Sequence, residues 1–227
     1  MARLRDWSEV SIRELTPQDA PALAEAFERL STESRDLRFL GAKPRLSTHD
    51  LEYLTNIDGH VHEALGALDA ATGRGVGVAR FVRLDPQAPV AEVAVTVIDS
   101  WQRRGLATLL LERLSERARA EGIERYTALV SGDNRAVVGL LDSIGARVLT
   151  ANAAAGTVEY EVELPAVGLG HSLRAALRAA ASGHMTLPRR VADALGSLLD
   201  HAAPSTEAPD SGESAAAGRP REPGTQD

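Results

Sequence analysis

Two arginines and a glycine stand directly before a leucine-rich stretch in SWQRRGLATLLLERL, residues 100–114. The first turn of a helix has unpaired backbone N–H groups and the positive end of the helix dipole, so it attracts anions. Gly105 and Ala107 leave the backbone open to a ligand, and Arg103 and Arg104 add permanent positive charge. These residues predict a phosphate site where a strand leads into a helix. The alternative is an ordinary helix start with solvated arginines.

Glu92 is the candidate for proton transfer. It lies in PVAEVAVTV, residues 89–97, where strand alternation places it on one face with Ala94 and Thr96. A carboxylate in so apolar a strand is expected either to sit at an open end of the sheet or to have a raised pKa. Either setting suits a general base that acts directly or through a water. The alternative is a solvated glutamate at the start of the strand.

Metal chemistry has little support in the sequence. The chain contains no cysteine, which excludes thiolate nucleophiles, disulfides and cysteine-ligated zinc. His60 and His62 share one face of a strand start, but no further ligand stands near them in sequence. We therefore expect no metal site, and we assign these histidines to the protein surface or to the lining of a substrate site.

Composition and charge exclude several classes of protein. The 227 residues carry a formal net charge of −7, which argues against general nucleic-acid binding. No apolar stretch approaches the ~20 residues that a membrane span needs, and the N-terminus has no secretory signal. The lack of cysteine fits a reducing compartment. We expect a cytoplasmic protein without nucleic-acid or membrane partners, and the oligomeric state is left open.

The first half of the chain predicts helices followed by strands. Thr16-Pro17 indicates a helix start, a second short helix is expected over residues 33–40, and Ser47 opens a third. The periodicity then changes to that of strands, which are predicted over residues 61–68, 75–84 and 90–98. The turns between these strands are short, so the strands form an antiparallel meander.

The second half predicts alternating strands and helices. A helix is expected over residues 106–120, a fully buried strand over 123–130 and a helix over 135–144. A last pair of strands follows at 147–150 and 157–164. This order predicts an α+β fold, an α/β three-layer arrangement in which helices flank a mixed, mostly antiparallel central sheet.

Three parts of the chain differ in composition. The α+β domain covers residues 1–165. Residues 166–203 are rich in Ala, Leu and Arg and predict a helical C-terminal extension. Residues 204–227 contain Pro, Ser, Gly and acids without a large apolar side chain, so this tail is expected to be disordered.

The motif Gln102-Arg103-Arg104-Gly105-Leu106-Ala107 resembles the Gln-x-x-Gly-x-Gly/Ala signature of the GCN5-related N-acetyltransferases, the GNAT superfamily. Residues 31–58 resemble the helical region that precedes the meander in bacterial members. ALVSGDNRAVVGLLDSIGA, residues 128–146, is similar to the later strand, Asn-containing loop and helix of the family. The resemblance covers roughly residues 10–165 and implies the GNAT fold.

The resemblance implies acetyl-CoA as co-substrate. It implies that the backbone of residues 103–108 holds the pyrophosphate and that residues 95–97 pair with the pantetheine arm. Asn134 matches the family position that contacts the cofactor near its thiol. The expected cofactor-binding residues are Val95, Thr96, Val97, Gln102, Arg103, Arg104, Gly105, Leu106, Ala107, Thr108 and Asn134.

The resemblance also implies the chemistry. Bacterial protein lysine acetyltransferases of this superfamily have a glutamate ten residues before the motif Gln that acts as general base, and Glu92 has this spacing from Gln102. This implies direct transfer of an acetyl group to a primary amine. The acceptor expected first is a protein lysine, and a small-molecule amine is the close alternative.

Two positions depart from the family pattern. Leu141 stands where many members have a tyrosine that acts as general acid, and Ala146 stands where a phenylalanine is usual. A substitute acid such as water, Ser131 or Tyr126 is not distinguished by the sequence, and Tyr126 is expected to pack within its strand. A GNAT-fold module that binds acyl-CoA or a partner protein without efficient turnover is therefore the competing interpretation.

Overall fold

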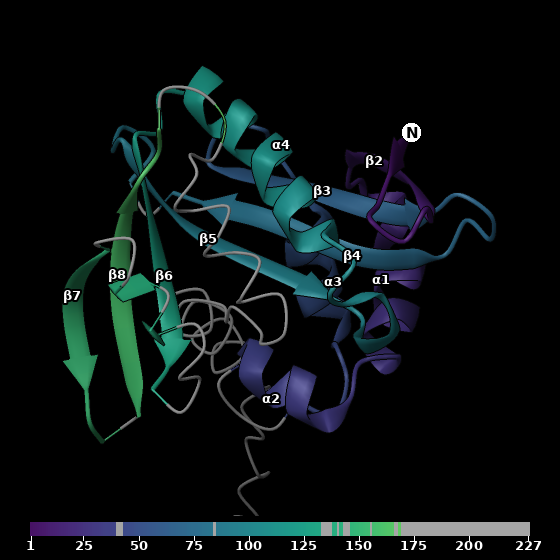
Figure 1. Ribbon diagram of the computed structural model, residues 1–227, viewed down its shortest axis with the longest axis horizontal. Coiled ribbons are helices and arrows are strands. Elements are labelled where there is room, and N and C mark those ends of the chain that lie inside the picture. The colour runs from purple at the N-terminus through teal and green to yellow at the C-terminus, as the bar shows by residue number, and fades with distance from the viewer. Residues whose placement is uncertain are drawn as a thin grey trace, which may run out of the picture.

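One mixed sheet of eight strands organises the protein, in the order β1-β2-β3-β4-β5-β6-β8-β7 (Figure 1). The computed structural model describes residues 1–39, 43–83, 85–132, 138–139, 141–142, 146–154, 156–165 and 168. The strands are β1 Ala2–Arg3, β2 Glu9–Glu14, β3 His62–Asp69, β4 Gly75–Val82, β5 Val90–Val97, β6 Arg125–Ser131, β7 Arg147–Asn152 and β8 Thr157–Glu163.

The pairing of these strands is antiparallel except between β5 and β6, which run parallel. Short turns join β3 to β4 and β4 to β5, whereas the whole of α4 lies between β5 and β6. This difference follows from the geometry, because a parallel pair needs a long crossover connection. The predicted mixed, mostly antiparallel sheet is confirmed.

Helices cover both faces of the sheet. They are α1 Ala20–Glu28, α2 Thr32–Phe39, α3 Thr48–Thr55 and α4 Leu106–Ala120, with single 3₁₀ turns η1 Pro17–Asp19 and η2 Asp99–Trp101 before α1 and α4. α4 crosses the near face in Figure 1, where Leu106 and Leu110 lie against Gly77 of β4. On the opposite face, Tyr53 of α3 stacks on His62 of β3, with ring centroids 5.2 Å apart.

The spacing of leucines in the sequence explains why α4, the helix before β6, forms. Leu106, Leu110 and Leu114 recur every fourth residue and are all buried, so one stripe of α4 covers the sheet. Gly122 follows the helix with a φ of +76°, a conformation that other residues rarely adopt, and ends it. At the other predicted helix starts, Asp19 accepts from the Thr16 N–H and Asp50 from the Ser47 N–H.

The N-terminal part of the sheet was not predicted. The expected order begins with helices, but β1 and β2 precede α1, and β2 pairs with β3 from Val10–Asp69 to Glu14–Leu65. β2 carries only Val10 and Ile12 as apolar alternation, and its partner lies more than fifty residues away, so the local signal is weak.

Other predictions fall partly or wholly outside the described residues. Within the helix expected over residues 135–144, residues 138–139 and 141–142 are helical. The proposed extension at 166–203 is described only at Gly168, and the tail at 204–227 is not described. In the part of the chain that the structure does describe, no helix combines the length and apolar character needed to cross a membrane.

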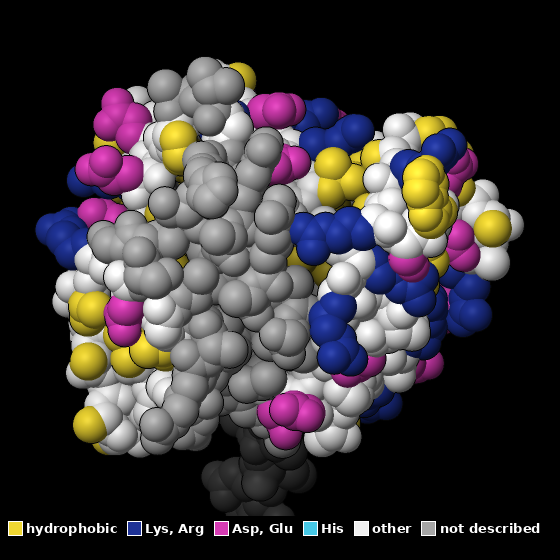
Figure 2. Space-filling model, in the orientation of Figure 1, with side chains coloured by type: hydrophobic (Ala, Val, Ile, Leu, Met, Phe, Trp, Pro, Cys, Tyr) yellow, Lys and Arg dark blue, Asp and Glu magenta, His cyan; other side chains and the backbone are white. Residues whose placement is uncertain are grey.

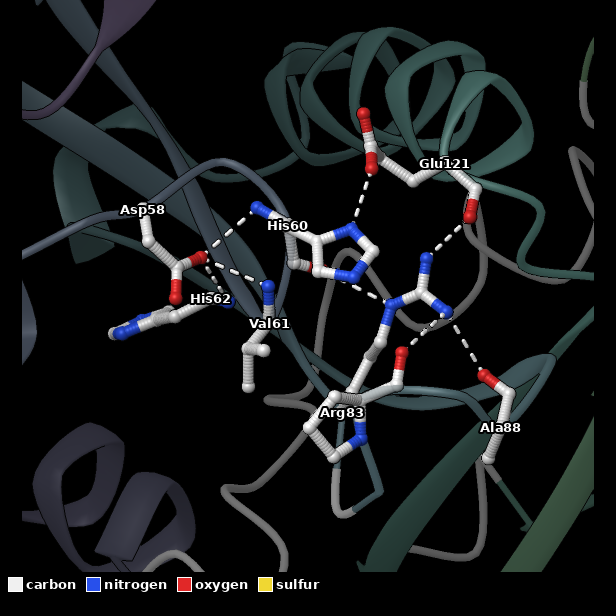
Figure 3. Close-up of polar contacts among 8 residues, drawn as sticks. Asp58, His60, Val61, His62, Arg83, Ala88 and Glu121 are labelled. Carbon is white, nitrogen blue, oxygen red and sulfur yellow. Dashed lines mark hydrogen bonds and ion pairs between the residues drawn. The ribbon is translucent and has the colours of Figure 1, made fainter.

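A buried arginine joins three segments at one end of the sheet (Figure 3). Arg83 follows β4 and is 5% exposed. Its guanidinium donates to the carbonyl oxygens of His60 at 3.0 Å, of Ala88 at 2.9 Å and of Glu121 at the end of α4. These carbonyls belong to the segment before β3, the β4–β5 turn and the residue after α4, so one buried side chain links three segments of the chain.

We expect Arg83→Met to lower the free energy of unfolding by about 3 kcal/mol, because it removes the hydrogen bonds through which one buried guanidinium links these three segments. Urea denaturation measures this loss. Arg74→Met is the matched control, since Arg74 is exposed and pairs only with Glu25 at the surface, and it should change stability by less than about 1 kcal/mol. Equal losses in the two variants would contradict the bridging role of Arg83.

Candidate active site

The parallel strands β5 and β6 pair along only part of their length in the middle of the sheet. Their ladder comprises only the pairs Val90–Arg125, Ala91–Tyr126 and Glu92–Thr127, although both strands continue. β5 meanwhile stays paired with β4 as far as Val97–Gly77. Beyond Glu92 the ladder between β5 and β6 ends, and Figure 1 shows the two strands diverging. An extended ligand with amide groups can pair with such an edge.

The loop between β5 and α4 connects this open edge to a helix start. Gly105 has a φ of +91° and immediately precedes α4, and Arg103 has a φ of +62°. A positive φ costs a residue with a side chain free energy, so the glycine suits this position. The Gln102 side-chain amide donates to the Val97 carbonyl at 3.2 Å and ties the loop to the end of β5.

The two arginines of the loop differ in their contacts. Arg104 forms an ion pair with Asp6 at 2.8 Å, donates to the Ser100 carbonyl at 2.6 Å and lies 4.8 Å above the Trp101 ring centroid. Its guanidinium thus holds the loop together. Among the described residues, Arg103 has neither a hydrogen-bond nor an ion-pair partner, so its charge is available to a ligand.

Thr108 adds a polar group in the first turn of α4. The residue is 8% exposed, and its Oγ1 has no hydrogen-bond partner within the described part of the chain. A buried hydroxyl without a partner is costly, and a phosphate oxygen would relieve that cost. The backbone N–H groups of the first turn, the Thr108 hydroxyl and the Arg103 charge could therefore bind one anion together.

Glu92 lies where β5 and β6 separate. It is 3% exposed and is the third residue of β5, so it is not a solvated glutamate at a strand start. Register places it in a row with His62 and Thr127, and residues paired across strands point to the same face. Because His62 stacks on Tyr53, this is the face covered by α3. The carboxylate thus stands beside the open edge of β5 on the side away from α4.

The two histidines are accounted for by protein contacts. His60 Nδ1 lies 2.7 Å from Glu121 Oε2, and His62 Nε2 lies 3.1 Å from Arg80 Nη1 (Figure 3 shows the first contact). Burial, followed by the charge of Arg80, lowers the pKa of His62 from 6.5 to about 3, so it is neutral near pH 7. Within the described residues no group of three or more His, Asp or Glu side chains is arranged to hold a metal ion.

A model of the "Acetyltransferase (GNAT) family" matches residues 25–146, which is more than half of the chain. The chain belongs to the GNAT acetyltransferase family. Members of this family use acetyl-CoA, so the resemblance read from the Gln102–Ala107 motif is confirmed.

Two curated relatives and one solved structure extend this family assignment. The chain is 33% identical over 157 residues to "Acetyltransferase Pat" of Mycolicibacterium smegmatis, covering 69% of this chain and 46% of that protein, so it spans less than half of that relative's length. It is 33% identical over 144 residues to "Acetyltransferase PA5475" of Pseudomonas aeruginosa, covering 63% and 77% of the two chains. The GNAT domain of S. lividans PAT superposes with a TM-score of 0.65 at 31% identity, covering 72% of this chain and 95% of that one.

Two positions of the GNAT pattern are not part of the site described above. Asn134 lies outside the described residues, so its contact with the cofactor stays a prediction. Leu141 is 4% exposed and belongs to the hydrophobic core, as expected of a leucine. Tyr126 is also buried, and burial raises the pKa of its hydroxyl, which agrees with the packing role predicted for it.

One contact of the loop between β5 and α4 was not predicted from the sequence. The Arg5 N–H donates to the Arg104 carbonyl at 3.2 Å, and the Arg5 side chain lies 3.4 to 3.6 Å from where a Cβ on Gly105 would stand. Residues 5 and 105 are far apart in the chain, and the N-terminal segment has no periodicity that signals this neighbour.

We expect Gly105→Ala to weaken acetyl-CoA binding by at least about 10-fold, because the added methyl group covers the backbone that the pyrophosphate approaches. Isothermal titration calorimetry measures the affinity. Gly73→Ala is the control, since Gly73 also has a positive φ, +70°, but lies in the β3–β4 turn with no atom within 4 Å of the new Cβ. Both variants should lose about 1–2 kcal/mol of stability, and only the first should lose affinity.

The low pKa of His62 predicts a pH-dependent stability. Between about pH 6.5 and about pH 3 the unfolded chain binds a proton at this histidine that the folded protein does not, so stability rises with pH across this window. From about pH 7.5 to about pH 5, wild type should lose about 2 kcal/mol more than His62→Leu does. Urea denaturation at both pH values tests this, and equal losses would show that His62 does not titrate in this way.

Proposed function

We propose that the protein is an acetyl-CoA-dependent N-acetyltransferase that acts on a primary amine, and that its acceptor is a protein lysine. One observation carries the catalytic proposal: Glu92 is buried where β5 and β6 separate, next to the edge that is open to a pantetheine arm. The lysine acceptor is supported by the 33% identity to Acetyltransferase Pat of M. smegmatis. It is also supported by the spacing of Glu92 from Gln102.

The cofactor would span two structural features that the chain holds together. The pyrophosphate would lie at the start of α4, against the backbone of residues 103–108, the Arg103 charge and the Thr108 hydroxyl. The pantetheine arm would pair with residues 95–97 of β5. The side-chain bond from Gln102 to Val97 fixes the distance between these two features. The thioester would then stand near Glu92.

The reaction requires a neutral amine. Glu92 would accept the proton of the acceptor ammonium, directly or through a water, and the amine nitrogen would attack the thioester carbonyl carbon. Backbone N–H groups of the open β5 edge would donate to the carbonyl oxygen as negative charge develops there. The C–N bond forms, the C–S bond breaks, and coenzyme A leaves as a thiolate that takes up, directly or through water, the second proton lost by the amine nitrogen. The acetyl group passes directly to the amine without a covalent enzyme intermediate.

The face on which Glu92 lies determines where the acceptor enters. Because its row of side chains faces α3, the amine would approach from the side of α3, and α4 would cover the opposite side. Access for a lysine side chain is thus separated from the phosphate loop that holds the cofactor.

A second candidate is a GNAT module that binds acyl-CoA without efficient turnover. The observation that favours it is Leu141, a buried leucine at the position where many family members have a tyrosine that protonates the leaving thiolate. A small-molecule amine is the alternative acceptor if turnover is found without a protein substrate.

We expect Glu92→Gln to lower kcat by at least about 100-fold while the KM for acetyl-CoA changes by less than about threefold, because the carboxylate acts on the amine and not on the cofactor. Release of coenzyme A from acetyl-CoA with a lysine-containing peptide measures this. Glu63→Gln is the matched control, since Glu63 is also buried but pairs with Arg117 of α4 on the other face, at 3.1 Å.

Three results would contradict the proposal. Equal activity of Glu92→Gln and wild type would remove Glu92 from catalysis. Binding of acetyl-CoA by wild type without turnover on peptides, proteins or small amines would favour the non-catalytic module. Turnover on small amines alone would replace the lysine acceptor. Circular dichroism of both variants at the assay temperature separates a chemical effect from loss of fold.

A further inference from the structure

We propose that Arg5, carried by the N-terminal turn, binds a phosphate group of acetyl-CoA at the start of α4. This inference rests on the proposed use of acetyl-CoA and adds a ligand-binding residue that lies about one hundred residues before the family motif. The shared chemistry is a phosphate oxyanion, and the two possible sources are the pyrophosphate and the 3′-phosphate of the adenosine.

The turn that carries Arg5 is firmly built. The Leu4 N–H donates to the Ser8 carbonyl at 2.8 Å, and the Asp6 carboxylate accepts from the Ser8 hydroxyl at 2.6 Å. Leu4 is buried in the hydrophobic core, so it anchors the turn from below. These contacts give the turn a defined position relative to the sheet and leave the Arg5 side chain exposed.

Two bonds join this turn to the phosphate loop. The Arg5 N–H donates to the Arg104 carbonyl at 3.2 Å, and Asp6 forms an ion pair with Arg104 at 2.8 Å. As a result the Arg5 side chain lies over Gly105, with Nε 3.4 Å and Cγ 3.6 Å from the position of a Cβ. Arg5 therefore stands at the residue that precedes α4, where the phosphate is expected.

The charges at this place are not balanced by the protein. Arg3 pairs with Glu9 and Arg104 pairs with Asp6, but among the described residues the side chains of Arg5 and Arg103 have no hydrogen-bond or ion-pair partner. Figure 2 shows Lys and Arg side chains gathered on the face that holds the start of α4 and the N-terminal strands. Two unpaired guanidinium groups beside the positive end of a helix dipole repel each other and that end of the helix. A phosphate bound between them would attract each of these positive charges.

The buried Thr108 hydroxyl gives independent support for an anion here. It lies in the first turn of the same helix, and its Oγ1 has no hydrogen-bond partner in the described part of the chain. A phosphate at the start of α4 would accept from this hydroxyl, from backbone N–H groups and from the Arg5 guanidinium, which is suited to two parallel hydrogen bonds with an oxyanion.

Calorimetry of the full chain with acetyl-CoA tests the role of Arg5. We expect Arg5→Gln to raise the Kd about 10-fold and Arg5→Lys to raise it by less, because lysine keeps the charge but cannot form the paired hydrogen bonds. Arg3→Gln is the matched control, because Arg3 lies in the same segment but pairs with Glu9, and its Kd should stay within about twofold of wild type.

A second titration with acetyl-3′-dephospho-CoA distinguishes the two phosphates. An equal loss for Arg5→Gln with both ligands assigns Arg5 to the pyrophosphate, and a loss seen only with acetyl-CoA assigns it to the 3′-phosphate. An Arg5→Gln variant that binds both ligands as tightly as wild type overturns the inference and leaves the proposed function intact. Absence of binding by wild type overturns the proposed function, and the inference with it.

Discussion

The separation of β5 from β6 beyond Glu92 is the constraint on which the site depends. The parallel ladder ends at Glu92–Thr127, while β4 continues to hold β5 in place as far as Val97. Beyond this point β6 no longer pairs with β5, and an extended ligand could pair with this edge as an added strand does. The same divergence places a buried carboxylate next to that edge. The proposed cofactor binding and the proposed proton transfer would thus both follow from where one pair of strands stops pairing.

A short loop fixes the position of the start of α4 relative to this edge of β5. Gln102 ties the loop to Val97, and the positive φ of Gly105 turns the chain into the helix. Arg104 serves the protein itself, since Asp6 and the Ser100 carbonyl hold its guanidinium. The N-terminal turn therefore holds this loop in place through Arg104, and among the described residues the Arg103 side chain is left without a hydrogen-bond or ion-pair partner.

Two buried glutamates of the same sheet lie on opposite faces and therefore differ in their contacts. Glu63 faces α4 and forms an ion pair with Arg117, and burial raises the pKa of its carboxyl. Glu92 faces the side of α3 beside the open edge of β5. Residue type and burial are alike, but Glu63 is held in an ion pair and Glu92 lies beside the separating strands, which makes Glu92 the candidate base.

Local patterns were enough to predict much of this protein. The leucine stripe of α4, the apolar strand around Glu92 and the Gln102–Ala107 motif each lie within a short stretch, so periodicity and spacing predict them directly. The strand β2, the contact of Arg5 with Gly105, the pairing of Arg104 with Asp6 and the early end of the β5–β6 ladder were not predicted. Each of these contacts joins segments far apart in the chain. Such contacts are set by the tertiary packing of the backbone, and the residues that meet show no periodic pattern from which the contact could be predicted.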